Sequence, residues 1–173
     1  MSKKLFTNCH IMDVVNKTVT EGSILVEDGV ITAAGDSVEA GDAQVIDLGG
    51  KYVMPGLFNC HTHMCMPPDP AVQYGRSDAQ ITMLALKHLR QHLNTGVTFI
   101  RDVGGMDYID IDIRNAAKKG EIVAPDMQVS GKCICMTGGH GWQMGREADG
   151  VDDCKKAARE QLRAGADWIK VMG

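Results

Sequence analysis

The pattern of apolar and polar positions changes near residue 50. Before that point, short apolar stretches alternate with polar turns, and two such stretches flank the pair Asp28 and Gly29. An Asp-Gly pair in this setting is typical of a tight β-hairpin. A further strand is expected at 43–48, after a polar link. We therefore expect residues 1–50 to form an N-terminal β-sandwich portion.

From residue 51 to residue 173 the pattern predicts strands that alternate with helices. Apolar residues recur three or four positions apart in the helical segments, and short apolar stretches lie between them. The expected strands are 52–59, 97–100, 127–134 and 168–172, and the expected helices are 78–94, 107–119 and 152–164. Such alternation implies a parallel sheet, either doubly wound or closed into a barrel. In a barrel, four strands would be the first half of a (β/α)8 fold.

Composition narrows the possible partners. With 44% hydrophobic and 23% charged residues, the chain is expected to fold as a soluble globular protein. A net charge of -4 provides no basic surface for nucleic acid or for an anionic membrane. The N-terminus lacks a secretory signal, so we expect a cytoplasmic protein. The six cysteines of the chain form no CxxC pair, and we expect them to be reduced residues that pack in the interior.

His61 and His63 are the first candidates for chemistry, because they follow directly after the expected strand 52–59. In an extended strand, residues i and i+2 point to the same side, so both imidazoles can reach one metal ion. Neutral imidazole nitrogens suit zinc or a similar cation, and parallel barrels carry their catalytic groups at the carboxyl ends of strands. The alternative is a pair of histidines that only make hydrogen bonds at a strand end.

Lys170 lies inside the apolar stretch DWIKVMG. Burial of an ammonium group is costly, so burial would lower the pKa of this lysine and leave an amine open to covalent modification. Alternatively, only the aliphatic stem packs and the ammonium group reaches solvent.

Four segments resemble one known family. VMPGLFNCHTH resembles the first barrel strand of the amidohydrolase superfamily, and ADWIKVMG resembles the fourth, which in many members carries a carboxylated lysine. GVTFIRDVGG resembles the second strand. GKCICMTGGHG resembles the third-strand region of the branch with imidazolonepropionase-like and prolidase-like enzymes. The resemblance covers nearly the whole chain.

The resemblance implies a site with two divalent metal ions, expected to be zinc. His61 and His63 would bind the more buried ion, and a carbon dioxide-derived carbamate on Lys170 would bridge the two. A metal-activated hydroxide would then hydrolyse a C–N bond. The family also uses two later histidines and an aspartate, which this sequence does not contain, so we expect an N-terminal part that is incomplete for catalysis as given.

Three further residues are candidates. The resemblance suggests that the loop MTGGHGWQMG lines the substrate pocket, where His140 could donate to a substrate carboxylate or to the scissile carbonyl; an exposed loop histidine is the alternative. Arg146 could bind a carboxylate or be a solvated surface residue. Asp102 could orient a metal-binding histidine or cap the next segment.

The favoured function is hydrolysis of a small-molecule substrate, a dipeptide or an N-acyl amino acid, by an Xaa-Pro dipeptidase-like enzyme. A cyclic-amide hydrolase of the imidazolonepropionase-like type is the alternative among enzymes. A non-catalytic truncated scaffold or metal-binding module is the alternative of another class. We expect a homo-oligomer, with neither nucleic acid nor membrane as partner.

Overall fold

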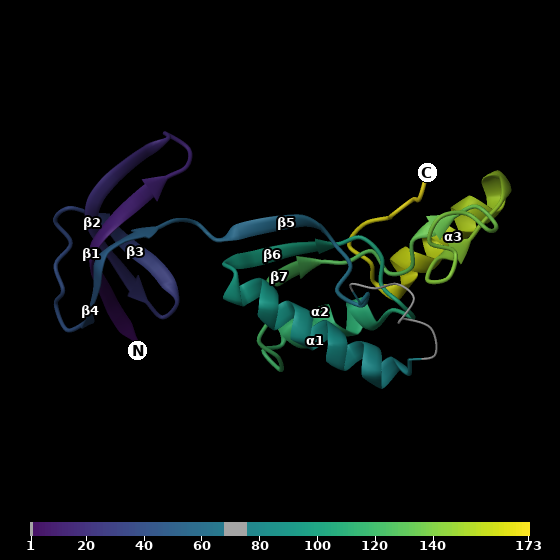
Figure 1. Cartoon of the computed structure of the whole chain (residues 1–173), viewed down its shortest axis with the longest axis horizontal. Helices are drawn as coiled ribbons and strands as arrows, with labels where there is room; N and C mark the ends of the chain where they lie inside the picture. The colour runs from purple at the N-terminus through teal and green to yellow at the C-terminus, as the bar shows by residue number, and fades with distance from the viewer. Residues whose placement is uncertain (1, 68–75) are drawn as a thin grey trace. The chain divides into compact units, whose positions relative to one another are not determined.

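A computed structural model describes residues 2–67 and 76–173 of the chain (Figure 1). One compact unit ends at Pro55 and a second begins at Gly56, whereas the sequence pattern placed the change at residue 50. The prediction of a single strand over 52–59 is wrong. One strand ends at Val53 and the next begins at Leu57, and Pro55 between them has no backbone N–H for a sheet.

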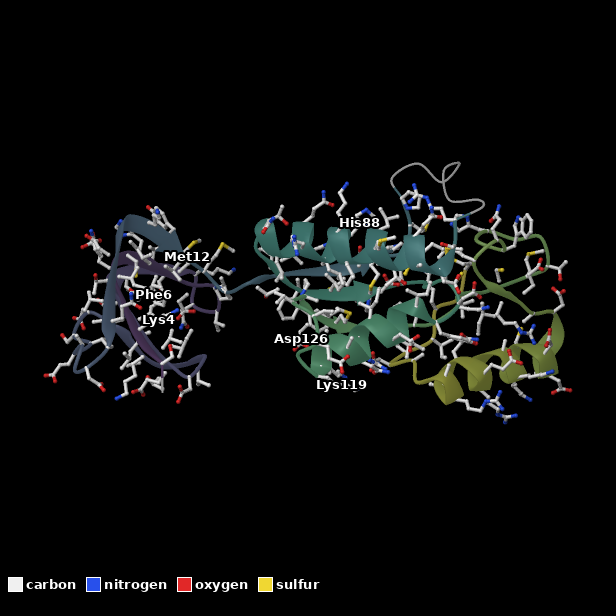
Figure 2. The ribbon with its side chains drawn as sticks, turned by 90° about the horizontal axis from the view of Figure 1, so that it is seen from below. Lys4, Phe6, Met12, His88, Lys119 and Asp126 are labelled. Atoms are coloured by element: carbon white, nitrogen blue, oxygen red, sulfur yellow. The ribbon has the colours of Figure 1, made fainter. Side chains whose placement is uncertain are left out.

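The first unit is a four-stranded sheet with the order β3-β2-β1-β4. Its strands are β1 (Lys3–Asp13), β2 (Thr18–Glu27), β3 (Val30–Gly35) and β4 (Gln44–Val53). The predicted hairpin is confirmed, since Glu27 pairs with Val30 and both Asp28 and Gly29 have positive φ angles of 47° and 85°. Positive φ at both central residues is the signature of a type I′ turn. Figure 2 shows Lys4, Phe6 and Met12 on this unit.

A parallel sheet of three strands, in the order β5-β6-β7, lies at the centre of the second unit. The strands are β5 (Leu57–Thr62), β6 (Val97–Asp102) and β7 (Asp126–Gln128). The helices α1 (Asp78–Asn94) and α2 (Ile109–Lys118) lie together against one face of the sheet (Figure 1). The predicted mixed α/β fold with parallel strands is confirmed.

The bounds of α1 agree with the predicted helix. Ser77 accepts a hydrogen bond from the backbone N–H of Gln80, and the Gln80 side chain accepts one from the backbone N–H of Ser77. This capping box satisfies donors at the start of the helix. Ile81, Ala85 and Leu89 are buried at four-residue intervals, so one stripe of α1 packs into the core.

The opposite face of the sheet carries two stacked aromatic rings. Phe58 and Phe99 pair across β5 and β6, with ring centroids 4.8 Å apart. Ile100, the neighbour of Phe99, is buried in the core, and strand alternation therefore turns Phe99 away from the helices. Phe58 is 69% exposed, so this face is open to solvent in the described residues.

The predicted strands 127–134 and 168–172 are wrong in extent. The chain after β7 forms two short parallel strands, β8 (Ile134–Cys135) and β9 (Arg146–Glu147), and then α3 (Gly150–Ala164). Two buried side chains explain the interruption: Asp110 accepts the N–H of Gly131, and Gln161 accepts the N–H of Lys132. These N–H groups are thus bound by side chains and not by a neighbouring strand.

The last predicted strand is reduced to one parallel bridge between Val171 and Ile134. Within the residues that the structure describes, no helix has the length and apolar character needed to cross a membrane.

Candidate functional site

The two candidate histidines lie at the carboxyl end of β5. Their ring centroids are 5.7 Å apart, and the ring planes meet at 68°. His61 is exposed, whereas His63 is partly buried. Both imidazoles therefore occupy the same end of the parallel sheet, as their i, i+2 spacing predicted.

A backbone carbonyl fixes the proton of His63. Nδ1 of His63 lies 3.3 Å from the carbonyl oxygen of Gly104, in the loop after β6. Because a carbonyl oxygen only accepts, Nδ1 carries the hydrogen and Nε2 keeps its lone pair in the neutral ring. Burial lowers the pKa of His63, and this effect exceeds the opposing effect of the Gly104 carbonyl. His63 is thus held as a neutral ring whose Nε2 lone pair is free to bind a metal ion.

The other two predicted residues, Lys170 and His140, interact electrostatically with His63. The charges of His61, Lys170 and His140 each contribute to the lowered pKa of His63, so all three lie within electrostatic range of that ring. The backbone of Lys170 lies beside β8: the N–H of Ile134, the first residue of β8, donates to the carbonyl oxygen of Lys170 at 2.8 Å. Lys170 is partly exposed and not fully buried.

The loop 136–145 connects β8 to β9 and contains His140, which is exposed. At its start, the Thr137 hydroxyl and backbone N–H both donate to the carboxylate of Asp149. Near its end, Met144 approaches the candidate site: a Cβ atom built on Gly104 would lie 3.2 Å from Met144 Cε and 3.4 Å from the His63 ring. The end of the loop therefore lies near His63.

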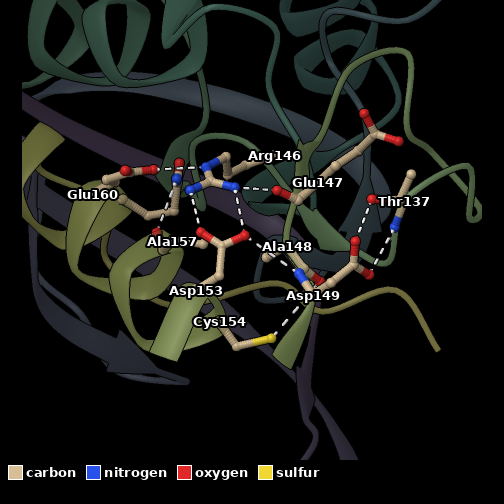
Figure 3. Close-up of polar contacts among 10 residues, drawn as sticks. Thr137, Arg146, Glu147, Ala148, Asp149, Asp153, Cys154, Ala157 and Glu160 are labelled. Atoms are coloured by element: carbon tan, nitrogen blue, oxygen red, sulfur yellow. Dashed lines mark hydrogen bonds and ion pairs between the residues drawn. The ribbon is translucent and has the colours of Figure 1, made fainter. Parts of the chain in front are cut away.

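Arg146 has a different role from those predicted (Figure 3). Its guanidinium donates to Asp153 at 2.7 Å and to Glu160 at 2.9 Å, both on α3, and also to the carbonyl oxygen of Glu147. These carboxylates raise the pKa of Arg146. Arg146 is therefore neither a solvated surface residue nor free to bind a substrate carboxylate; it ties β9 to α3.

Asp102 binds backbone and not an imidazole. Its carboxylate accepts the N–H of Met64 at 2.6 Å and the N–H of Gly104 at 3.1 Å. The side chain is fully buried, and burial raises the pKa of Asp102 to about 8. Of the two predicted roles, direct contact with a histidine is absent, and the carboxylate instead holds the chain after β5 and after β6.

The cysteines bear out their prediction only in part. All six are free, but Cys60 and Cys154 are exposed, so these two are not packing residues. Burial raises the pKa of the Cys65 thiol, which favours the neutral form. Among residues 2–67 and 76–173, no group of three or more His, Cys, Asp or Glu side chains could hold a metal ion.

Sequence reasoning missed His88, on α1. Nδ1 of His88 lies 2.9 Å from the carbonyl oxygen of Met64, the residue that follows His63. A signal was available, because His88 lies seven positions after Ile81 and three after Ala85, on the stripe of α1 that faces the core.

Comparison with known proteins supports one family. A prolidase whose structure contains N-methylphosphonate-L-proline is 27% identical and has a TM-score of 0.86, and the match covers 99% of this chain and 46% of that one. Ochratoxinase from Aspergillus niger is 30% identical over 149 residues, which are 69% of this chain and 30% of the relative. Dihydroorotase from Acetivibrio thermocellus is 40% identical over 78 residues, which are 44% of this chain and 17% of the relative.

The chain thus spans less than half the length of each of these relatives. The model of the amidohydrolase family matches residues 52–173, which include the histidine pair, the loop 136–145 and Lys170. This chain belongs to the amidohydrolase family.

Proposed function

We propose that the whole protein, the natural polypeptide to which these residues belong, hydrolyses the C–N bond of a dipeptide or an N-acyl amino acid. The observation that carries the proposal is the pair of imidazoles of His61 and His63 at the carboxyl end of a parallel sheet, with Lys170 within electrostatic range of His63. The likeness to a prolidase over 99% of the chain supports the substrate class. The dihydroorotase match covers 44% of the chain and supports the cyclic-amide alternative less strongly.

The donor set suits a divalent cation of the zinc type. His61 and His63 would hold one ion, since the Nδ1–H of His63 binds Gly104 and its Nε2 is free. Lys170 would join them as a carbamate: the side-chain nitrogen forms an N–C bond to carbon dioxide, one N–H proton is released, and two oxygen donors result. When bound, two such ions would activate a water molecule and polarise the scissile carbonyl.

The residues of the chain itself would position the reactants. His140 would face the substrate from the loop 136–145, where its ring can donate to a carbonyl or a carboxylate oxygen. The contact of Met144 beside Gly104 and His63 supports the placement of this loop next to the reacting groups. His63, whose Nδ1–H binds the Gly104 carbonyl, would serve as a ligand through Nε2.

We also propose that the second unit is the first half of a (β/α)8 barrel, and that the first unit is part of a β-sandwich. Parallel sheets are normally covered on both faces. Here α1 and α2 cover one face, and Phe58 and Phe99 lie on the other. Further barrel strands would cover this apolar face.

Metal analysis of the whole protein, combined with a screen of dipeptides and N-acyl amino acids, tests the proposal. We expect close to two divalent ions per chain and turnover of at least one substrate of these classes. Turnover of cyclic amides alone would favour the alternative substrate class. Bound metal without hydrolysis of any C–N bond would favour the metal-binding module, and a protein that lacks both properties would contradict the proposal. Sedimentation of the same preparation tests the predicted homo-oligomer.

A further inference from the structure

Two side chains hold the peptide groups of Met64 from opposite ends. The N–H of Met64 donates to Asp102 at 2.6 Å, and its carbonyl oxygen lies 2.9 Å from Nδ1 of His88. Met64 is completely buried, and it directly follows His63. The backbone on the carboxyl side of the candidate ligand is therefore tied both to the end of β6 and to α1.

The carboxylate of Asp102 also acts on the other contact of His63. Its second oxygen accepts the N–H of Gly104, whose own carbonyl oxygen accepts from Nδ1 of His63. A backbone bond from the N–H of Val103 to the carbonyl oxygen of Thr62, at 2.8 Å, closes the arrangement. One buried carboxyl group thus holds both the segment that carries the His63 ring and the segment that orients it.

His88 completes this arrangement from the helix side (Figure 2). Since the Met64 carbonyl oxygen only accepts, Nδ1 of His88 carries the hydrogen. Its Nε2 is then an acceptor, and the side chain borders a pocket of about 320 Å³ together with Thr62 and Met66. His92, one helical turn later, binds the carbonyl oxygen of His88 and the amide of Asn59 instead, and not the peptide groups of Met64.

We propose that Asp102 and His88 are positioning residues for His63. By holding the Met64 peptide groups and, through Gly104, the His63 ring, they keep Nε2 of His63 aimed at the bound cation. The inference rests on the proposed function in one respect, that His63 is a metal ligand. Partners of this kind change metal affinity by about 10 to 100-fold when they are removed.

Zinc affinity of the whole protein, measured by chelator competition, tests the proposal. Asp102→Asn and His88→Leu are each expected to weaken zinc binding by at least about tenfold. His88→Asn keeps an N–H donor at a position close to that of Nδ1 and is expected to restore most of the affinity. His92→Leu is the matched control, with expected affinity close to that of the wild type. Wild-type affinity in both Asp102→Asn and His88→Leu, or an equal loss in His92→Leu, overturns the proposal.

A second readout separates positioning from a general loss of stability. Asp110→Asn alters another fully buried carboxylate, which accepts the N–H of Gly131 and not that of Met64. Hydrogen exchange of the Met64 amide or the Gly104 amide is expected to be at least about tenfold faster in Asp102→Asn than in Asp110→Asn, because the carboxamide at position 102 has one oxygen for these two N–H groups. Equal exchange rates of both amides in the two variants overturn the proposal.

The exchange measurement also distinguishes the two proposals from each other. A wild-type protein that binds no metal contradicts the proposed function, while the exchange of the Met64 and Gly104 amides still decides whether Asp102 holds these peptide groups. A wild-type protein that binds zinc through His63, with unchanged affinity in the Asp102 and His88 variants, contradicts only the positioning role.

Discussion

Nδ1 of His63 faces the carbonyl oxygen of Gly104 across 3.3 Å, and this contact decides which nitrogen of the ring is available. The carbonyl requires a hydrogen on Nδ1, so the lone pair is on Nε2. If His63 is a metal ligand as proposed, a ring already oriented by the loop after β6 would lower the cost of ordering this ligand when a cation binds.

Substitution of either histidine at the end of β5 should reduce the metal content of the whole protein. His61→Ala or His63→Ala is expected to weaken metal binding by more than about tenfold, because each removes a proposed nitrogen donor. Inductively coupled plasma mass spectrometry of the purified variants measures the ions per chain. His92→Ala is the control, and unchanged stoichiometry in both substituted proteins would argue against the ligand assignment.

Lys170→Ala should lose metal and activity, because the carbamate oxygens go with the amine. Addition of a short carboxylic acid is expected to restore part of both, since its two oxygens can replace those of the carbamate. Lys132→Ala serves as the control, because its Nζ pairs with Asp107 at 2.7 Å. Full activity of Lys170→Ala without added acid would contradict the bridging role.

His140→Ala should retain its metal and lose turnover. If the imidazole donates to the scissile carbonyl, kcat falls by roughly 100 to 1,000-fold; if it binds a substrate carboxylate, KM rises and kcat changes little. Steady-state kinetics on the best substrate from the screen separates the two outcomes. Gln143→Ala, an exposed neighbour on the same loop, is the control, and unchanged kinetics in His140→Ala would reduce His140 to a loop residue.

The buried Asp102 should make stability depend on pH. Its pKa of about 8 exceeds the ordinary value of 3.8, so the native state keeps a proton that the unfolded chain releases between those two values. The free energy of unfolding should therefore fall as pH rises through this window, by at most about 1.4 kcal/mol per pH unit.

Urea unfolding at a series of pH values, with Asp102→Asn as the reference protein, measures this effect. Below about pH 6.5, the lowered pKa of His63 makes the free energy of unfolding rise with pH, because the unfolded chain takes up a proton that the native state does not. The two proteins are therefore compared between about pH 6.5 and pH 8, above the range in which His63 contributes. Parallel stability curves for the two proteins would refute the expected protonation of Asp102.

Arg146→Ala should destabilise the packing of β9 against α3. The guanidinium binds two carboxylates and a carbonyl, so the expected loss is roughly 1–2 kcal/mol, above the value for a single exposed ion pair. Thermal unfolding measures the loss. Lys155→Ala, which removes the exposed pair with Asp152, should have almost no effect, and equal melting temperatures for the two variants would contradict the structural role.

Local sequence patterns predicted those parts of the fold that local chemistry determines. The apolar spacing from Ile81 to Leu89 predicted α1, and Asp28 with Gly29 predicted the hairpin. The strand over 127–134 was wrong because its N–H groups bind side chains from α2 and α3. Such long-range contacts leave no periodic signal along the chain.

In the candidate site, too, local patterns identified some residues, and others depend on contacts that are distant along the chain. His61 and His63 could be identified from their spacing, and the resemblance pointed to Lys170. The partners of Arg146 come from α3, seven and fourteen residues further along the chain, and no motif marks them. His88 was missed because an imidazole on the buried stripe of a helix is not distinctive until its carbonyl partner is known.

The stacked rings of Phe58 and Phe99 have a consequence for synthesis. If the barrel is completed by residues beyond these, a ribosome that adds about 5–20 amino acids per second leaves this aromatic face uncovered for roughly ten seconds or more. During that interval, the exposed aromatic face of the nascent chain can bind chaperones or other nascent chains on neighbouring ribosomes. Expression of residues 1–173 alone would make that transient condition permanent, and insoluble inclusion bodies would be the expected product.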